Sequence, residues 1–303
     1  MSEGYVEWEG HRTWYRLVGD IHDARPPLVI CHGGPGITHD YLGPVARLAD
    51  HGRPCILYDQ IGNGRSDHLP DAPSAFWTVD LFLRELRALV KHLDLEDGHH
   101  VLGQSWGGML ALEYAFQRPA GLQSLVLADA LASMPTYIQE VDRLVAALPP
   151  EIREPLRRHE EAGTTDDPAY REAVVRFYER HLLRVSWPEA LPDHVRRTFA
   201  AARDDPTVYG TMVGPSEFHV TGTLRDWDIT DRLGEIAVPA LLISGRHDEV
   251  TPKVVAELHE GLPNSEWVLF ENSSHMPHVE ETDRFLEVVG SFLSKADPGA
   301  TDA

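Results

Sequence analysis

The eight residues 101–108 read Val-Leu-Gly-Gln-Ser-Trp-Gly-Gly and join an apolar run to the start of a predicted helix. The pattern Gly-x-Ser-x-Gly in this context is typical of a nucleophile elbow, a sharp strand-to-helix turn that exposes a serine. Glycines flank the serine because side chains at those positions would clash with the neighbouring backbone. We therefore expect Ser105 to be a nucleophile, with the Trp106 N–H at the helix N-terminus facing an oxyanion on the substrate.

Short apolar runs recur along the whole chain. They predict strands at Trp14–Val18, Leu28–Cys31, Cys55–Tyr58, His100–Gln104, Ser124–Ala128, Ala240–Ser244 and Trp267–Phe270. Nearly continuous apolar runs are typical of strands that are buried on both faces of a parallel sheet. Helical periodicity lies between them, most clearly at Val79–Leu93. The alternation predicts an α/β fold with a mostly parallel central sheet flanked by helices.

The alternation stops after residue 131 and resumes at residue 230. The intervening stretch is charged, contains several prolines and predicts helices at Ile138–Leu148, Glu151–Ala162 and Pro168–Leu183. We therefore expect a core formed by residues 1–131 and 230–295, and an inserted helical cap at residues 132–229. A disordered tail is expected at residues 296–303. A cap in this position can cover the carboxyl ends of the strands, where α/β sheets bind ligands.

The composition limits the partners and the compartment. The net charge of −21, from 48 acidic and 27 basic residues, disfavours nucleic acid and anionic membranes as partners. The excess of acidic residues promotes solubility, and attraction of a cationic substrate such as a free amine is the alternative interpretation. No apolar window has the length of a membrane span, and no leader peptide is recognisable at the N-terminus. Cys31 and Cys55 lie in strand-like runs, as reduced structural thiols do. We expect a cytoplasmic monomer or small homo-oligomer.

A nucleophilic serine needs a histidine that removes its proton and a carboxylate that orients the histidine. In folds with this elbow the chain order is serine, acid, histidine, with each residue after a strand. Asp248 follows the predicted strand Ala240–Ser244, and His275 follows the last predicted strand. The sequence thus predicts Ser105, Asp248 and His275 as the catalytic residues.

Three further residues are alternatives for these positions. Asp129, after the strand that follows the elbow, is an alternative acid, and so is Glu249. His278 is an alternative base, three residues beyond His275. The sequence leaves these alternatives open.

A second oxyanion donor is expected on the glycine-rich loop His32–Gly36, which follows an early strand. We favour the Gly34 amide and keep Gly33 as the alternative. The loop lacks the ending of a phosphate-binding loop and the spacing of a dinucleotide fingerprint. No cysteine pair or His-x-x-x-His spacing predicts a metal site, so we expect neither a cofactor nor a metal.

Three motifs in order, His32–Gly36, Asp59–Ser66 and Gly103–Gly108, resemble the proline iminopeptidase family of α/β-hydrolases. The branch of tricorn-interacting aminopeptidases and L-amino-acid amidases is the most similar. The similarity runs from about residue 5 to residue 293 and includes two further motifs, at residues 214–228 and at His247–Pro252.

The resemblance implies an enzyme that releases an N-terminal residue, often proline, from a small molecule or short peptide with a free N-terminus. It also implies that Glu217 in the cap and Glu249 beside the expected acid hold the substrate's amino group, with Tyr209 in the same pocket. Loop differences, such as Ile61 and Asn63, leave the released residue open. An esterase or small-amide hydrolase with the same triad is the main alternative, and a non-catalytic ligand-binding protein is a remote one.

Overall fold

An eight-stranded sheet forms the centre of the protein, whose computed structural model describes residues 1–23 and 25–299. The strands are β1 (Ser2–Trp8), β2 (His11–Val18), β3 (Leu28–Cys31), β4 (Cys55–Tyr58), β5 (His99–Gln104), β6 (Leu122–Ala128), β7 (Ala240–Gly245) and β8 (Ser265–Phe270). Their order is β1-β2-β4-β3-β5-β6-β7-β8. Strands β3 to β8 are parallel, whereas β1 and β2 pair antiparallel. The expected α/β fold is confirmed.

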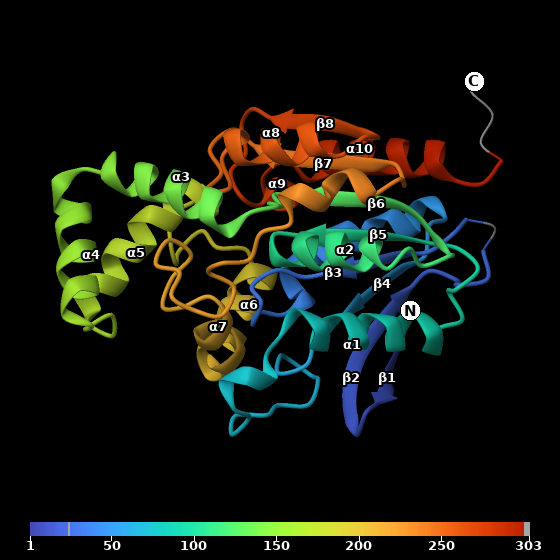
Figure 1. Ribbon diagram of the computed structural model, residues 1–303, viewed down its shortest axis with the longest axis horizontal. Helices are drawn as coiled ribbons and strands as arrows, with labels where there is room; N and C mark the ends of the chain where they lie inside the picture. The colour runs from blue at the N-terminus through green and yellow to red at the C-terminus, as the bar shows by residue number, and fades with distance from the viewer. Residues whose placement is uncertain (24, 300–303) are drawn as a thin grey trace.

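Helices cover both faces of this sheet (Figure 1). The α-helices are α1 (Val79–His92), α2 (Trp106–Phe116), α3 (Met134–Ala146), α4 (Pro150–Ala162), α5 (Pro168–His181), α6 (Asp193–Asp204), α7 (Thr207–Met212), α8 (Pro252–Gly261), α9 (Pro277–Glu280) and α10 (Thr282–Ala296). Three 3-10 helices are η1 (His39–His51), η2 (Ser74–Phe76) and η3 (Thr230–Glu235). Helices α1, α2 and α8 pack in the core layer on one face, and η1 and α10 pack on the other.

The sequence of β3 shows why its apolar run is continuous. Val29 and Cys31 belong to the core layer that contains α1 and α2, whereas Leu28 and Ile30 belong to the layer of η1 and α10. Successive side chains point to opposite faces of a strand, so a strand covered by helices on both faces needs apolar residues at every position.

All seven predicted strands are present, and the structure adds an eighth at the N-terminus. In β1 only Val6 and Trp8 are buried, because β1 is an edge strand that pairs with β2 alone. A half-exposed edge strand has few apolar residues, and this is why the search for apolar runs missed it.

Between β6 and β7 the described chain contributes no strand to the sheet and instead forms helices α3 to α7. Figure 1 shows these helices gathered at one end of the sheet. The two ends of the insertion lie side by side, since the Ser133 hydroxyl donates to Asp228 Oδ2 at 2.8 Å. The Ile229 N–H also donates to the Ala132 carbonyl, at 2.9 Å. The insertion therefore leaves and re-enters the core at one place.

The prediction that residues 296–303 are disordered is wrong for Ala296 and Asp297. Helix α10 continues to Ala296, and the Asp297 carboxylate forms an ion pair of 2.7 Å with Arg53, whose side chain is 2% exposed. A buried guanidinium needs such a partner, which the polar composition of the tail does not reveal. Residues 300–303 of the predicted tail lie outside the described residues.

Cys31 and Cys55 are both buried free thiols, as expected. No helix in the described part of the chain is long and apolar enough to cross a membrane.

Candidate active site

The turn between β5 and α2 has the geometry of a nucleophile elbow. Ser105 lies at φ 56° and ψ −123°, a conformation that non-glycine residues rarely adopt. A Cβ at Gly103 would lie 2.0 Å from the Gly107 carbonyl oxygen, and one at Gly107 would lie 2.1 Å from the Cys31 carbonyl oxygen. Both glycines are therefore required for α2 to follow β5 so closely, as the sequence pattern indicates.

Asp248 and His275 meet at the carboxyl ends of β7 and β8. His275 Nδ1 lies 2.7 Å from Asp248 Oδ1, which also accepts the Val250 N–H at 2.9 Å. Both side chains are buried. Burial lowers the pKa of His275, but the charge of Asp248 and its hydrogen bond outweigh that effect, so the net pKa is raised. Because Nδ1 carries the ring proton and donates a hydrogen bond to the Asp248 carboxylate, His275 Nε2 stays available to accept a proton.

The hydrogen bond between Asp248 and His275 distinguishes the predicted acid and base from two of the alternatives, Glu249 and His278. Glu249 makes no hydrogen bond to His275, and its Oε2 is buried without a partner within the described residues. His278 is buried with neither ring nitrogen bonded to a described residue. The geometry therefore supports Asp248 as the acid and His275 as the base.

Ser105 is partly exposed, and no hydrogen bond joins its hydroxyl to His275 among the described residues. Such bonds are often long before substrate binds. Both residues stand on loops at the carboxyl ends of strands, Ser105 after β5 and His275 after β8, on either side of β6 and β7 in the sheet.

The hydrogen bonding of the backbone N–H groups shows which glycine of the loop His32–Gly36, Gly33 or Gly34, is free to bind an oxyanion. The Gly33 N–H donates to the Tyr41 hydroxyl at 2.8 Å. In the described structure the N–H groups of Gly34 and Trp106 make no hydrogen bond, and both residues line the same cavity as Ser105. Gly34 is held at φ 107°, where a Cβ would lie 2.6 Å from the Gly36 nitrogen. The free N–H favours Gly34 over Gly33 as the oxyanion donor.

Sequence reasoning missed Tyr41 and treated Gln104 only as a variable position of the elbow. The Tyr41 hydroxyl donates to Gln104 Oε1 at 2.5 Å, and Gln104 Nε2 donates to the His275 carbonyl at 2.9 Å. No motif marks Tyr41, which lies in η1 and reaches the site only through the fold.

A second set of polar contacts supports the elbow from the other side. The Trp106 indole N–H donates to Gln60 Oε1 at 2.8 Å, and Gln60 Nε2 donates to the His32 carbonyl at 2.8 Å. The Gln60 N–H donates to His32 Nε2 at 2.9 Å, so His32 Nδ1 carries the proton that reaches the Gly33 carbonyl. Burial lowers the pKa of His32 to about 4, which keeps the ring neutral. The His32 side chain is fully buried.

Two acidic side chains, Glu217 from the cap and Glu249 from the core, line the cavity together with Ser105. The Tyr209 hydroxyl donates to Glu217 Oε1 at 2.8 Å, and the Tyr137 hydroxyl donates to the Glu217 carbonyl at 3.0 Å. The pKa of Glu217 is raised by its enclosure, although Tyr209 and His275 oppose the effect. Burial and the neighbouring charges of Glu217 and Asp248 raise the pKa of Glu249 well above its usual value.

The chain is similar to known proteins over nearly its whole length. A family model described as the alpha/beta hydrolase fold matches residues 26–282. The proline iminopeptidase of Clostridium botulinum is 38% identical over 298 residues, which are 98% of this chain and 99% of that protein. This chain belongs to the proline iminopeptidase family of α/β hydrolases. Membership in this family makes the chain an enzyme of the hydrolase class.

Solved structures agree with this family assignment. The proline iminopeptidase of Mycobacterium smegmatis is 42% identical, with a TM-score of 0.89 and coverage of 97% of this chain and 98% of that one. VinJ is 47% identical, with a TM-score of 0.95 and coverage of 97% and 99%. The resemblance to the proline iminopeptidase family is thus confirmed over nearly the whole chain.

In this member of the proline iminopeptidase family the cavity above Ser105 is small and otherwise apolar. Its volume is about 20 Å³, room for about one water molecule. Its remaining lining residues are Met109, Leu131, Met134, Tyr137, Val213, Leu224 and Val250. A substrate residue enters only when lining side chains or the cap shift.

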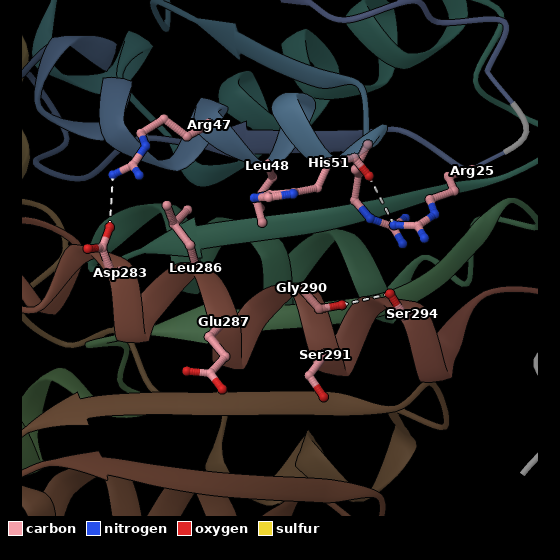
Figure 2. Close-up of a pocket in the computed structure, with 11 residues that line it drawn as sticks. Arg25, Arg47, Leu48, His51, Asp283, Leu286, Glu287, Gly290, Ser291 and Ser294 are labelled. Carbon is pink, nitrogen blue, oxygen red and sulfur yellow. Dashed lines mark hydrogen bonds and ion pairs between the residues drawn. The ribbon is translucent and has the colours of Figure 1, made fainter. Parts of the chain in front are cut away.

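A larger cleft of about 500 Å³ lies between η1 and α10 (Figure 2). Arg25 and Arg53 on its wall precede β3 and β4, so this cleft lies at the amino ends of the strands, opposite Ser105. Its Arg47 is paired with Asp283 at 3.1 Å, as the dashed line in Figure 2 shows. The cleft is not part of the candidate active site.

One group of described residues has the composition of a metal site. Asp129, Asp248 and His275 bring one ligand atom each within 4.8 Å of one another. His275 Nδ1 lies 2.7 Å from Asp248 Oδ1, a hydrogen-bond distance, so this nitrogen already has a partner and the group is described better as a hydrogen-bonded cluster.

Proposed function

We propose that this protein is a serine aminopeptidase or amino-acid amidase, which releases the N-terminal residue of short peptides or amides through an acyl-enzyme. One observation carries the proposal: the carboxylates of Glu217 and Glu249 line the same small cavity as Ser105. A nucleophile next to a pair of acids selects a carbonyl that is adjacent to a positively charged amine.

The chemistry begins at Ser105. His275 Nε2 accepts the hydroxyl proton while Ser105 Oγ attacks the carbonyl carbon of the first residue. Asp248 holds the protonated imidazole through Nδ1, and the N–H groups of Gly34 and Trp106 receive the oxyanion. His275 then gives the proton to the leaving amine, and water releases the amino acid from Ser105 by the same steps in reverse.

The two glutamates explain substrate recognition by electrostatics. In the empty pocket burial raises the pKa of both glutamates, and the charge of Glu217 raises the pKa of Glu249 further. A substrate ammonium placed between Glu217 and Glu249 would donate a charge-assisted hydrogen bond to each carboxylate and reduce their mutual repulsion. Hydrogen bonds to charged groups contribute about 1.5–3 kcal/mol each. The side chain of the bound residue would contact the apolar lining formed by Met109, Leu131 and Met134.

The apolar lining favours proline or another apolar residue at the N-terminus. The relatives named proline iminopeptidase support this choice. An esterase that accepts uncharged acyl groups would leave both glutamates without a counter-charge, so we place that activity second. The cytoplasmic location and the monomeric or small homo-oligomeric state stay predictions from the sequence.

Replacement of the nucleophile tests this proposal. Ser105→Ala should abolish hydrolysis of alanine and proline arylamides and should prevent labelling by a fluorophosphonate. Ser74→Ala, at an exposed position in η2, is the matched control and should keep both. Full activity of Ser105→Ala would contradict the proposal, and so would labelling of the wild type at another serine.

A further inference from the structure

Asp129 stands beside the Asp248–His275 pair and has no role in the steps above. It is fully buried at the end of β6, at φ 52°. Its Oδ1 accepts the Gly245 N–H at 3.3 Å. One carboxylate oxygen of Asp129, one of Asp248 and one ring nitrogen of His275 lie within 4.8 Å of one another. A second carboxyl group therefore adjoins the residue that orients the base.

The hydrogen bonds leave one oxygen of each carboxyl group without a partner. Asp248 Oδ1 accepts from His275 and Val250, but Asp248 Oδ2 is buried and unbonded among the described residues. Asp129 Oδ2 is buried and unbonded in the same way. Two ionised carboxylates at this separation would repel each other and would leave two bare buried oxygens, which is costly.

A single proton placed between the two carboxyl groups would give both oxygens a partner. We propose that Asp129 is a neutral carboxylic acid that donates a hydrogen bond to Asp248 and thereby positions the carboxylate that orients His275. This inference rests on the proposed function, because it assigns a positioning residue to the same site.

The surroundings of Asp129 agree with a neutral acid. Burial and then the charge of Asp248 raise its pKa well above the usual value, and Glu280 from α9 adds to the effect. Tyr41 from η1 faces it as a neutral phenol, because burial raises the Tyr41 pKa beyond the physiological range. Among the described residues that surround it, only His275 can become positive, and its Nδ1 is hydrogen-bonded to Asp248. The cluster thus holds a single negative charge, on Asp248.

Two substitutions separate this role from simple packing. In Asp129→Asn the amide N–H replaces the acid proton, so kcat should stay within about threefold of the wild type. In Asp129→Leu no donor remains, so kcat should fall by about 5-fold to 150-fold with little change in KM, as expected for one unpaired buried acceptor. If Asp129→Asn loses as much activity as Asp129→Leu, Asp129 acts as an ionised group and the proposal is wrong.

A measurement of stability against pH tests whether Asp129 is protonated in the folded protein, and it does not depend on catalysis. A carboxyl group with a raised pKa stabilises the fold fully below its ordinary pKa of about 4, and this contribution is lost as the pH rises toward the folded-state pKa. The melting temperature of the wild type should therefore fall relative to that of Asp129→Asn between pH 5 and pH 8. The exposed control Asp231→Asn should differ from the wild type by a constant amount.

A constant difference for Asp129→Asn over this pH range would show that Asp129 is ionised in the folded protein, and the inference would fail. Because the measurement needs no substrate, that failure is distinguishable from an error in the proposed peptidase activity. Conversely, if the difference in melting temperature depends on pH as predicted but the protein has no peptidase activity, only the proposed function is contradicted.

Discussion

The hydroxyl of Tyr41 donates a 2.5 Å hydrogen bond to Oε1 of Gln104, the residue before the elbow serine. The same hydroxyl accepts the Gly33 N–H at 2.8 Å, and Gln104 Nε2 donates to the His275 carbonyl at 2.9 Å. Gly33, Gln104 and His275 belong to segments at the ends of β3, β5 and β8. One tyrosine thus fixes the oxyanion loop, the elbow and the histidine loop relative to one another, as accurate alignment of reacting groups requires.

Tyr41→Phe should lower kcat more than it changes KM. The substitution leaves the Gly33 N–H and Gln104 Oε1 unpaired in a fully buried site. Such a loss costs about 1–3 kcal/mol of unfolding free energy for each unsatisfied group. Steady-state kinetics on an alanine arylamide and urea denaturation measure the two effects. Tyr5→Phe, at a residue that is 47% exposed, is the control. Wild-type kcat in Tyr41→Phe would show that the three segments do not need this link.

Glu217→Gln should weaken the binding of substrates with a free amino group. Loss of one charge-assisted hydrogen bond of about 1.5–3 kcal/mol corresponds to an increase in KM of about 10-fold to 150-fold. Substrates with an acetylated amino group should be affected far less. Glu151→Gln, at an exposed position of α4, is the control and should leave both KM values unchanged. Equal effects on free and acetylated substrates would exclude an amine contact for Glu217.

Activity should fall as the pH decreases through a midpoint above the ordinary histidine value of about 6.5. Burial lowers the pKa of His275, but the Asp248 charge and hydrogen bond raise it by more. His275 must be neutral to accept the serine proton, so protonation at low pH abolishes catalysis. The raised pKa of Glu217 acts in the same direction, since amine binding needs its ionised form. A profile of kcat/KM against pH measures this, and constant activity between about pH 5 and pH 8 would refute the assignment of the base.

Gly103→Ala should destabilise the protein by more than about 2 kcal/mol, because the added Cβ would overlap a backbone carbonyl that cannot move aside. The nearest atom would be the Gly107 oxygen at 2.0 Å. Gly43→Ala is the matched control, since a Cβ there has no atom within 4 Å. Thermal unfolding of the two variants compares them directly. Similar melting temperatures would mean that the elbow tolerates a side chain.

The sequence predicted the elements that depend on local patterns. Continuous apolar runs identified the buried strands. The chain order of serine, acid and histidine predicted Ser105, Asp248 and His275, which follow β5, β7 and β8 in the structure, although Ser105 is not hydrogen-bonded to His275 there. Asp129 was considered only as a competing acid. Its place beside Asp248 depends on the pairing of β6 with β7, which no local pattern specifies.

Other features could not be predicted because their partners are distant in the chain. Tyr41 acts through Gln104, which is 63 residues away. Asp297 is ordered by an ion pair with Arg53, 244 residues earlier. The proposed amine-binding role of Glu217 came from the family resemblance, since a glutamate in a helical insertion is by itself most often solvent-exposed.

The central claim is that the acids in the pocket select a free amino end for attack by Ser105. It is tested most directly by the ratio of kcat/KM for alanine p-nitroanilide to that for its N-acetylated form. The account predicts that the free amine is preferred by at least about 10-fold, the smallest effect expected from one charge-assisted hydrogen bond. Equal kcat/KM values for the two substrates would contradict it.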